Sequence, residues 1–485
     1  MRSRLQLVAV VVIVVATMLA VTPGASPAPL FDEPAAPPNI VLFFVDDQRS
    51  DQLSFMSTVM QDVAGRGVHF TEAFAVNPLC CPSRVSVLRG QFSHSTRIYR
   101  NRRIYGGFDY AKKIGVDQST IATWLQASGY RTALMGKYLN GYSGDAKLTY
   151  VPPGWDVWRA FETNPSNVPF FNYRMSVDGA TQQFGSTDQD YSTDVIASMA
   201  DDFIRETPAD QPLFLYATPV APHTPRTPAP RHAMAACPAR AITPSVGEPD
   251  VTDKPSFIQS LPWDTTKLNQ AKNTWTKGCR SLYAVDDAVD TVLQALTDTG
   301  RLPNTLFVYA SDNGHLLGEH RYFGKTVAYE ESIRIPVAIR WDAVVAQPGS
   351  VDGRMVGNID LTATFVDAAG VTPPFAMEGM SLLPLLRGDG VAWRTDLLIE
   401  HFDTAGTEGF IPTYCAVRTQ TELFVRYDPD DVSVMVEELY DLATDPYQLT
   451  NLLAGAPAAE IAARRDELLA RTEELCQPPP PSYAF

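Results

Sequence analysis

Asn39-Ile40-Val41-Leu42-Phe43-Phe44-Val45 is a continuous apolar run that ends on the twinned carboxylates Asp46-Asp47. A segment that is apolar at every position, rather than at alternate ones, indicates a parallel strand buried on both faces. Further strands are expected at 131–135, 212–218, 305–310 and 335–339, and helices at 55–64, 119–128, 281–297 and 360–369. This alternation predicts an α/β fold with a large, mainly parallel sheet flanked by helices.

Beyond residue 386 the pattern changes to short strand-like segments at 397–399, 414–418, 423–427 and 434–439, followed by a helix at 459–475. This order predicts a small antiparallel sheet with a helix packed on it. Two segments of the first part have no regular pattern: 140–190 is expected to be long loop, and 224–272 a Pro-rich insertion at the surface or pocket rim. We therefore divide the chain into residues 1–29, an α/β domain at 30–385 and a C-terminal α+β subdomain with its tail at 386–485.

The chain of 485 residues has a net charge of −16 and is 45% hydrophobic, so it can bury a large core. Such an acidic balance argues against a nucleic-acid partner and against an anionic membrane surface. Any site that binds an anion must therefore be a local basic pocket, helped by a metal cation.

The first 29 residues have the pattern of a signal peptide. Arg2 and Arg4 precede an apolar run and an exit rich in Pro, Ala and Ser. The run is shorter than the ~20 residues that comfortably span a bilayer, which favours cleavage; an uncleaved anchor is the alternative. The protein is therefore expected to be secreted, periplasmic or on the cell surface, with no membrane contact beyond export.

Six cysteines would lie in an oxidising compartment after export. Cys80 and Cys81 are adjacent and are poor partners for each other. Cys237 with Cys279 and Cys415 with Cys476 are a hypothesis for the other four, because each pair falls within one region of the chain. The sequence does not prove the connectivity.

Cys80-Cys81-Pro82-Ser83-Arg84 is the most distinctive motif. Pro82 has the φ that the first turn of a helix needs, so the two cysteines are expected at the N-terminal mouth of a helix. Unpaired backbone N–H groups there favour an anion. Arg84 adds a planar fork of donors that suits a tetrahedral oxyanion. Together these features indicate chemistry on a phosphate or sulfate group.

Polar side chains follow four of the predicted strands: Asp46-Asp47, Lys137, His223 and Asp312-Asn313. Ligands of open parallel sheets bind beyond the carboxyl ends of the strands, so these groups are expected to converge. Asp46, Asp47, Asp312 and Asn313 offer oxygen ligands only, which fits Ca²⁺ or Mg²⁺ rather than zinc. Each pair taken alone could equally be a turn or a helix cap.

The other positively charged candidates carry weaker signals. Lys137, His223 and Lys325 are each, taken singly, compatible with a solvated surface residue. His315 and His320 follow the Asp312 pair and are candidates to line the site, and His401 is a candidate to influence substrate choice. His69 and His232 are interpreted as structural, and His94 is left unassigned.

The motifs resemble those of the type I, formylglycine-dependent sulfatases of the alkaline-phosphatase superfamily. Cys80-x-Pro82-Ser83-Arg84 with Leu88 and Gly90 is similar to the first signature of that family, and Gly129-Tyr130-Arg131-Thr132 through Gly136-Lys137 to the second. A later block also matches: Ser311-Asp312-Asn313-Gly314, Gly318-Glu319-His320, Lys325 and Tyr329-Glu330 to Arg334-Ile335-Pro336. The resemblance spans about residues 38–455 and implies an alkaline-phosphatase-like fold.

The resemblance also implies a mechanism. Cys80 would be oxidised to formylglycine by a formylglycine-generating enzyme before the chain folds. Its aldehyde hydrate, held by Ca²⁺ and Arg84, would attack the sulfur of a sulfate monoester. The calcium ligands would be Asp46, Asp47, Asp312 and Asn313, with residue 80 facing the metal. Lys137 and Lys325 would hold sulfate oxygens, and His223 would help protonate the departing alcohol.

One motif departs from the common family pattern and points to one branch of the family. Where many members have Gly-Lys-Trp-His, this chain has Gly136-Lys137-Tyr138-Leu139-Asn140, so the histidine credited with releasing the bound sulfate is missing. Asn140 or a histidine from elsewhere is the candidate replacement. The same motif, with Val151-Pro152-Pro153-Gly154-Trp155 and Glu438-Leu439-Tyr440-Asp441, resembles the N-acetylglucosamine-6-sulfatase and heparan endosulfatase branch. That branch implies a 6-O-sulfated amino sugar or a related glycan as substrate.

Two other functions remain open from the sequence. A phosphonate or phosphate ester hydrolase of the same superfamily would need a similar site for a tetrahedral anion. A non-catalytic glycan-binding relative would keep Cys80 as a thiol, although the full set of catalytic residue types argues against it.

Overall fold

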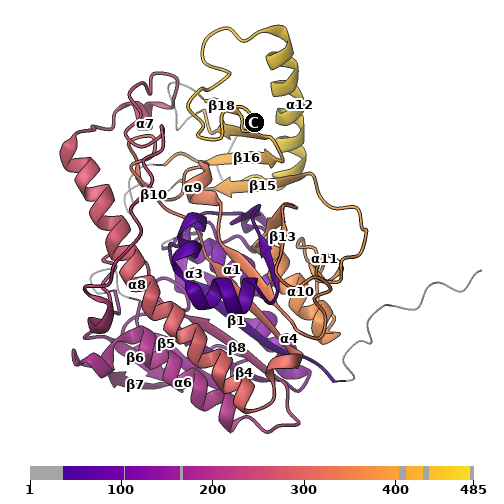
Figure 1. The fold of residues 1–485 in the computed structure, drawn as a ribbon. Coiled ribbons are helices and arrows are strands. Elements are labelled where there is room, and N and C mark those ends of the chain that lie inside the picture. Colours follow the sequence, from indigo (N-terminus) through magenta and orange to yellow (C-terminus); the bar gives the residue numbers. More distant parts are fainter. Residues whose placement is uncertain (1–35, 103, 164–167, 404–410, 430–435, 481–485) are drawn as a thin grey trace, which may run out of the picture. The chain divides into compact units, whose positions relative to one another are not determined.

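One ten-stranded sheet is the framework of the computed structural model, which describes residues 36–102, 104–163, 168–403, 411–429 and 436–480 (Figure 1). The expected signal peptide at 1–29 lies outside the described residues. The strands, in their order across the sheet, are β13 (Ser350–Asp352), β2 (Val68–Phe70), β12 (Val337–Arg340), β9 (Thr305–Ser311), β1 (Asn39–Val45), β8 (Leu213–Thr218), β4 (Arg131–Gly136), β5 (Val157–Phe161), β6 (Arg174–Val177) and β7 (Ala180–Gln183).

The five strands in the middle, β9, β1, β8, β4 and β5, all run parallel to one another. Strand β12 is antiparallel to β9 and β2, and β6 and β7 add an antiparallel edge. The predicted fold class, a large and mainly parallel sheet flanked by helices, is therefore confirmed.

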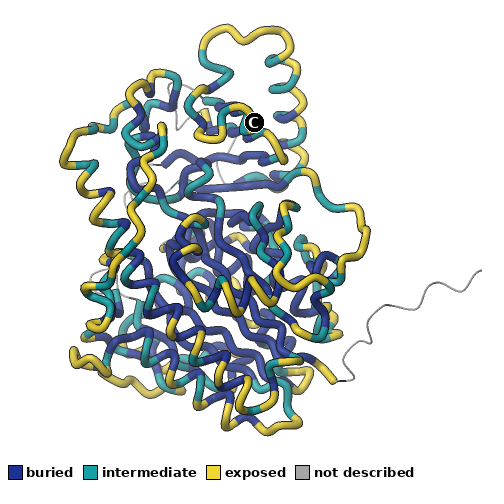
Figure 2. The backbone as a smooth tube through the Cα atoms, in the orientation of Figure 1, coloured by how far each residue is buried: buried dark blue, intermediate teal, exposed yellow. Residues whose placement is uncertain are grey.

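Strand β1 explains why the sheet is covered on both faces. Its alternate side chains Ile40, Leu42 and Phe44 enter one hydrophobic core, together with residues of α1 (Cys80–Arg89), α4 (Ile121–Ala127) and α10 (Ile359–Ala369). Val41, Phe43 and Val45 of β1 enter a second core with α6 (Ser192–Glu206) and α8 (Thr265–Asp298). All seven residues of β1 are buried, as a strand between two helical layers requires (Figure 2).

A second, antiparallel sheet follows the first, as predicted. Its strands, in order, are β15 (Asp396–His401), β16 (Tyr414–Thr419), β17 (Glu422–Tyr427) and β18 (Glu437–Asp441). One face packs against α12 (Ala459–Leu475) through Val417, Phe424, Leu439 and Leu468. The opposite face, including Tyr414 and Tyr427, packs against Val327 and Tyr329. The domain boundaries at residues 30 and 386 stay predictions.

The remaining elements are short. The other α-helices of the described residues are α2 (Ser93–Thr96), α3 (Gly107–Lys113), α5 (Asp145–Leu148), α7 (Ser256–Gln259), α9 (Glu330–Ile333) and α11 (Leu383–Leu386). Two small sheets pair β10 (Leu316–Leu317) with β11 (Phe323–Gly324), and β3 (Ala73–Phe74) with β14 (Val356–Gly357). None of the helices in the described part combines the length and apolar character that crossing a membrane requires.

The prediction of long loop at 140–190 is wrong, because this segment supplies β5, β6 and β7 to the sheet. A tight turn at Asp178-Gly179 connects β6 to β7, and both residues have positive φ, 50° and 84°. Asp-Gly with φ above zero at both positions matches a type I′ hairpin turn, which suits the twist of the paired strands.

Two predicted helices differ from the observed ones. The helix expected at 55–64 is two pieces, η1 (Ser50–Phe55) and η2 (Val59–Ala64). The break is stabilised by the Asp286 carboxylate, which accepts hydrogen bonds from the backbone N–H groups of Thr58 and Val59. The helix expected at 281–297 begins instead at Thr265, where the Asp264 side chain caps it by accepting from the backbone of Lys267. The insertion at 224–272 therefore ends in a helix.

The hypothesis for the disulfides is confirmed. Cys237 pairs with Cys279, which ties the insertion to α8, and Cys415 pairs with Cys476, which ties β16 to the end of α12. Cys80 and Cys81 are both free and buried.

Candidate active site

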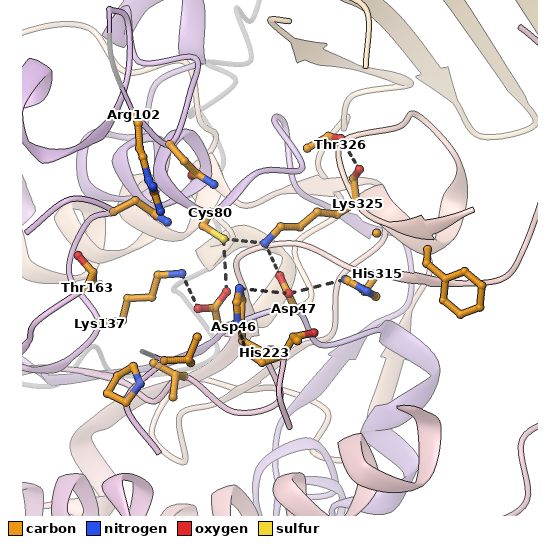
Figure 3. Close-up of a pocket in the computed structure, with 18 of the residues that line it drawn as sticks. Asp46, Asp47, Cys80, Arg102, Lys137, Thr163, His223, His315, Lys325 and Thr326 are labelled. Carbon is orange, nitrogen blue, oxygen red and sulfur yellow. Dashed lines mark hydrogen bonds and ion pairs between the residues drawn. The ribbon is translucent and has the colours of Figure 1, made fainter. Parts of the chain in front are cut away.

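The four predicted strand ends converge because their strands are neighbours. Strands β9, β1, β8 and β4 are consecutive and parallel, so their carboxyl ends meet at the same edge of the sheet. Asp312-Asn313, Asp46-Asp47 and Lys137 directly follow β9, β1 and β4, and His223 follows β8 after a short turn. A pocket of 340 Å³ opens at this edge, and Asp46, Asp47, Lys137 and His223 line it (Figure 3).

Cys80 is the first residue of α1, and Arg84 follows one turn later. Both side chains are buried, with exposures of about 1%. The Arg84 guanidinium pairs with Asp312, its Nη2 lying 2.9 Å from Oδ2, and donates to the Lys137 carbonyl at 3.2 Å. Arg84 thus connects the start of α1 to the ends of β9 and β4, which fixes residue 80 above the strand ends.

Two lysines hold the carboxylates at this edge. Lys137 Nζ lies 2.5 Å from Asp46 Oδ2, and Lys325 Nζ lies 2.5 Å from Asp47 Oδ1 and 2.7 Å from Cys80 Sγ (Figure 3). Burial opposes ionisation and is the largest single effect, but the neighbouring cations together outweigh it, led by Lys137 at Asp46 and by Lys325 at Asp47. The pKa of each carboxyl therefore falls well below its usual range. Both aspartates are therefore anionic at neutral pH.

A third carboxylate lies in the same cluster. Burial and the Asp46 charge raise the pKa of Asp312 to about 6, although Arg84 and the lysines oppose the shift. Asp312 Oδ1 accepts from the Asp47 backbone N–H at 3.1 Å, and Asp47 has a positive φ of 67°. Crowding of three carboxylates raises a pKa in this way when the local positive charge does not balance them.

Asn313 completes the cluster, and the hydrogen bonding of its side-chain amide indicates whether a metal ion fits there. Its Nδ2 donates to Asp47 Oδ1 at 2.7 Å, while its Oδ1 is buried without a hydrogen-bond partner among the described residues. Buried acceptors are rarely left unpaired. Ligand atoms of Asp46, Asp47, Cys80 and His223 also lie within 4.8 Å of one another. An unpaired amide oxygen beside crowded carboxylates fits a hard divalent cation.

Two histidines flank Asp47. His223 Nε2 lies 3.8 Å and His315 Nδ1 3.6 Å from Asp47 Oδ2, and both residues line the pocket (Figure 3). Burial and the neighbouring Arg226 lower the pKa of His315 well below its usual range, so its imidazole is neutral. The His223 side chain is 28% exposed, and its Nδ1 lies 2.7 Å from the Thr224 carbonyl, which orients Nε2 toward the pocket side.

Cys80 in thiol form is a poor nucleophile here. Burial and the Asp46 charge raise its pKa above the usual thiol range, and these effects outweigh the two lysines. The thiolate, not the thiol, is the reactive form. Cys81 packs into the core on the α1 side of the sheet, and its backbone N–H donates to Asn101 Oδ1 at 2.9 Å.

The other histidines named from the sequence do not line this pocket. His320 Nδ1 lies 2.6 Å from Glu248, His94 lies between Glu378 and Glu400, and His232 pairs with Asp287 at the surface. His69 is on β2, and His401 is fully buried on β15. The expectation that His320 lines the site is wrong, and of the insertion at 224–272 only Thr224 does so.

Sequence reasoning missed several residues that line the pocket: Asn101, Arg102, Thr163, Val168, Pro169, Val220, Tyr322, Phe323, Gly324 and Thr326. The last four flank Lys325, so proximity in sequence was a usable signal for them. Arg102 and Thr163 lie beside Lys137 in Figure 3 but on separate loops. No spacing in the sequence connects these two residues with the strand ends.

The C-terminal sheet supports the loop that carries Lys325. Tyr414 Oη, on β16, donates to the Thr326 carbonyl at 2.8 Å, and the Thr326 backbone N–H donates to the Pro78 carbonyl at 3.1 Å. Three residues further on, Tyr329 Oη donates to Glu438 on β18 at 2.9 Å. The position of Lys325 therefore depends on the C-terminal sheet as well as on the ten-stranded sheet.

Comparisons with known proteins agree over most of the chain. Residues 38–371 match the family model described as Sulfatase, and residues 318–474 match N-sulphoglucosamine sulphohydrolase, C-terminal. Human N-acetylglucosamine-6-sulfatase is 32% identical over 453 residues, which cover 86% of this chain and 81% of the relative.

Solved structures share the fold. A protein in complex with its substrate D-glucosamine-2-N,6-O-disulfate superposes with a TM-score of 0.75 at 25% identity, covering 91% of this chain and 98% of that one. A phosphonate monoester hydrolase of Agrobacterium radiobacter superposes with a TM-score of 0.66 at 21% identity, covering 90% and 94%. At that identity the second likeness concerns the fold alone.

Proposed function

This chain belongs to the sulfatase family and is a sulfuric ester hydrolase, and we propose that it desulfates a 6-O-sulfated amino sugar or a related glycan. The observation that carries the proposal is the contact of Cys80 Sγ with Lys325 and Asp46 at the mouth of α1, inside the pocket. The substrate class is supported by the N-acetylglucosamine-6-sulfatase relative and by the structural neighbour, which is in complex with D-glucosamine-2-N,6-O-disulfate.

Residue 80 acts, in this proposal, as formylglycine made from Cys80, with Ca²⁺ or Mg²⁺ beside it. When present, the aldehyde hydrate would supply the attacking oxygen, and the cation would stabilise the negative charge on that oxygen. The raised pKa of the Cys80 thiol supports this assignment, because an unmodified, protonated cysteine would not attack sulfate. Asp46, Asp47, Asp312 and Asn313 would hold the cation, with residue 80 facing it.

The basic side chains bind the sulfate group. Lys325 is in direct contact with residue 80, and Lys137 and Arg84 both reach Asp46, which lies beside residue 80. Fixed cations aimed at sulfate oxygens stabilise the charge that develops in the transition state. Their burial excludes water, which strengthens each of these interactions.

His223 protonates the departing alcohol. It is the more exposed of the two histidines in the pocket, at 28% against 14% for His315, so it faces the side from which a sugar enters. Its Nδ1 contact with the Thr224 carbonyl leaves Nε2 for the substrate.

Asn140 takes the place of the histidine that many relatives have after the Gly-Lys pair. It lines the pocket, and its Oδ1 is buried without a partner among the described residues. An amide cannot serve as a base, so we assign Asn140 to positioning the hydrate or a water molecule.

Export is part of the proposal. Relatives include a putative extracellular sulfatase of Caenorhabditis elegans and an extracellular sulfatase homolog of Drosophila melanogaster, at 33% and 32% identity. The two disulfides are compatible with an oxidising compartment outside the cytosol. A signal peptide at 1–29 would direct the chain there, and N-terminal sequencing of the secreted protein tests this assignment.

Mass spectrometry of the peptide that contains Cys80 is the direct test. We expect an aldehyde in place of the thiol in protein from the native host, and an unmodified cysteine would remove the mechanism. Parallel kcat/KM values for aryl sulfate and aryl phosphate esters separate a sulfatase from a phosphonate or phosphate ester hydrolase. Faster phosphate turnover would contradict the assignment, and turnover of neither ester would favour a glycan-binding role.

A further inference from the structure

The active-site pocket adjoins a second hollow. The two cavities, of 340 and 570 Å³, share four lining residues: Asn101, Arg102, Asn140 and Thr163. The second hollow extends along α3, where Gly107, Asp109 and Lys113 line it. A ligand bound at Cys80 therefore has room to continue past Arg102, on the side of the pocket that Lys137 and Thr163 form in Figure 3.

The second hollow is basic although the chain carries a net charge of −16. Its charged lining residues are Arg102, Lys113 and Lys147 against Asp109 alone. Lys147 Nζ is already paired with Asp109 at 2.7 Å. Arg102 and Lys113 are thus left without a compensating acidic group in the lining.

Arg102 is the link between the two cavities. It is exposed and makes no hydrogen bond or ion pair with any other described residue. An unpaired guanidinium at the border of two cavities presents its planar donor fork to a ligand, and that fork fits carboxylate or sulfate oxygens. Asn140 also lines both cavities and so lies at the same border.

We propose that the second hollow binds a second anionic group of the substrate, a carboxylate or a sulfate, through Arg102 and Lys113. This inference rests on the proposed function and narrows it. The preferred substrate is then a sulfated glycan with at least two anionic groups, one at Cys80 and another beyond Arg102, rather than a neutral sugar with one sulfate. A second anionic group attracted by these cations gives selectivity without new contacts at the reacting sulfate.

Binding and turnover of three probes test the inference: N-acetylglucosamine 6-sulfate, glucosamine with N- and 6-O-sulfates, and a disaccharide that joins the 6-sulfated sugar to a uronic acid. Kd is measured on the Cys80→Ala background, which cannot turn over, and kcat/KM on the active enzyme. Arg102→Ala and Lys113→Ala should each lower affinity and kcat/KM for the two dianionic probes roughly fivefold to tenfold more than for the monosulfated one. The probe that loses more tells whether the hollow prefers sulfate or carboxylate.

Lys112→Ala is the matched control. Lys112 directly precedes Lys113 on α3, but its Nζ lies over the Tyr150 ring, 3.4 Å from the ring centroid, and the residue lines neither cavity. Its removal should leave the ratio between dianionic and monoanionic probes unchanged. Raising the salt concentration should shrink the effect of Arg102→Ala, because it is electrostatic and solvent-accessible.

Equal losses on all three probes would overturn the inference while leaving sulfatase function intact. An effect of Lys112→Ala as large as that of Lys113→Ala would also overturn it, since net charge alone would then explain the data. If the wild-type enzyme with formylglycine at residue 80 turns over none of the sulfate esters, the proposed function fails and the inference fails with it.

Discussion

Two regions of this protein bury acidic groups, and they do so in opposite ways. At the strand ends, Asp46 and Asp47 contact lysine cations, and the pKa of each carboxyl is lowered. On β18, Glu438 is equally buried, but its oxygens accept from three tyrosine hydroxyls, those of Tyr329, Tyr427 and Tyr440, at 2.6–2.9 Å. Burial there outweighs the hydrogen bonds and raises the pKa of Glu438.

The difference separates a reactive site from a structural one. Each Glu438 oxygen has neutral partners, which satisfies it without leaving an open coordination position. The strand-end cluster instead has opposed charges beside a pocket and an unpaired Asn313 oxygen. Crowded carboxylates of this kind are typical of functional sites, where a bound ligand or cation balances their charge. Changes at the strand ends should therefore alter rate, and changes around Glu438 should alter stability.

Cys80→Ala should have the largest effect. Removing the nucleophile is expected to lower kcat by about five orders of magnitude. Cys81→Ala is the control, because Cys81 is equally buried one residue later but packs in the core. It should cost about 1–2 kcal/mol of unfolding free energy and change kcat/KM only a few-fold. Steady-state kinetics and urea unfolding measure both, and similar rate losses for the two variants would contradict the assignment of Cys80.

Replacing a buried lysine in each region gives the next comparison. Lys325→Met removes the cation between Asp47 and Cys80, and kcat/KM should fall about 10²- to 10³-fold. Lys254→Met removes a fully buried lysine that pairs with Asp253 at 2.8 Å near Tyr440. It should cost about 3 kcal/mol of stability, because its acidic partners lose their compensating cation, while the rate per folded molecule changes little. A large rate loss in Lys254→Met would contradict the view that the region around Glu438 serves stability and not the reaction.

Metal removal tests the strand-end cluster without mutation. A chelator should lower activity about 100-fold and lower the Tm, and Ca²⁺ at 100 times its Kd should restore about 2.7 kcal/mol of stability. Asn313→Ala should need more Ca²⁺ for the same thermal shift, because it removes the unpaired acceptor. Differential scanning fluorimetry measures the shift without relying on turnover. A Tm that does not respond to Ca²⁺ or Mg²⁺ would refute the metal assignment.

Glu438→Gln should destabilise the protein with a smaller effect on rate. One oxygen becomes an NH₂ group that faces tyrosine O–H donors, so at least one hydroxyl loses its acceptor. The expected cost is about 1–3 kcal/mol of unfolding free energy, with kcat/KM reduced less than threefold. Chemical denaturation gives the first value, and an unchanged midpoint would show that Glu438 is not a structural group.

Tyr414→Phe should have the smallest effect on stability. It should also affect both properties, because Tyr414 connects the C-terminal sheet to the loop that carries Lys325. It removes only the hydrogen bond from Tyr414 Oη to the Thr326 carbonyl, worth about 0.5–1.5 kcal/mol. Because Thr326 follows Lys325, kcat should also fall a few-fold, with KM for an aryl sulfate less affected. Tyr427→Phe, which removes a bond to Glu438 instead, is the control and should change stability alone.

The strand-end cluster was predictable from the sequence because parallel strands bring their carboxyl ends together whatever lies between them. Asp46, Lys137 and Asp312 each directly follow a strand, so a strand prediction was enough to place them at one edge. The Glu438 cluster was not predictable. Tyr329 and Glu438 are 109 residues apart and belong to a helix cap and an antiparallel strand, whose packing no local pattern determines.

The edge hairpin and the second hollow also escaped prediction. Strand β7 is exposed at all four positions, so it lacks the apolar signal that identified the central strands. The Asp178-Gly179 turn between β6 and β7 was a usable signal that the composition of the surrounding segment obscured. Arg102 is an exposed arginine with no periodicity around it, and only the cavities that meet beside it distinguish it from other surface charges.

In the proposed function Cys80 is oxidised, and its burial in the folded protein would set a time limit on that modification. Lys325, which contacts the Cys80 sulfur, is 245 residues further along the chain. Asp312, which pairs with Arg84, is 228 residues after Arg84. At ~5–20 residues synthesised per second, the segment around Cys80 emerges on the order of 10 to 50 seconds before the partners that enclose it. An enzyme that oxidises Cys80 must act within that interval. Slowing synthesis should raise the modified fraction, and faster closure of the fold should lower it.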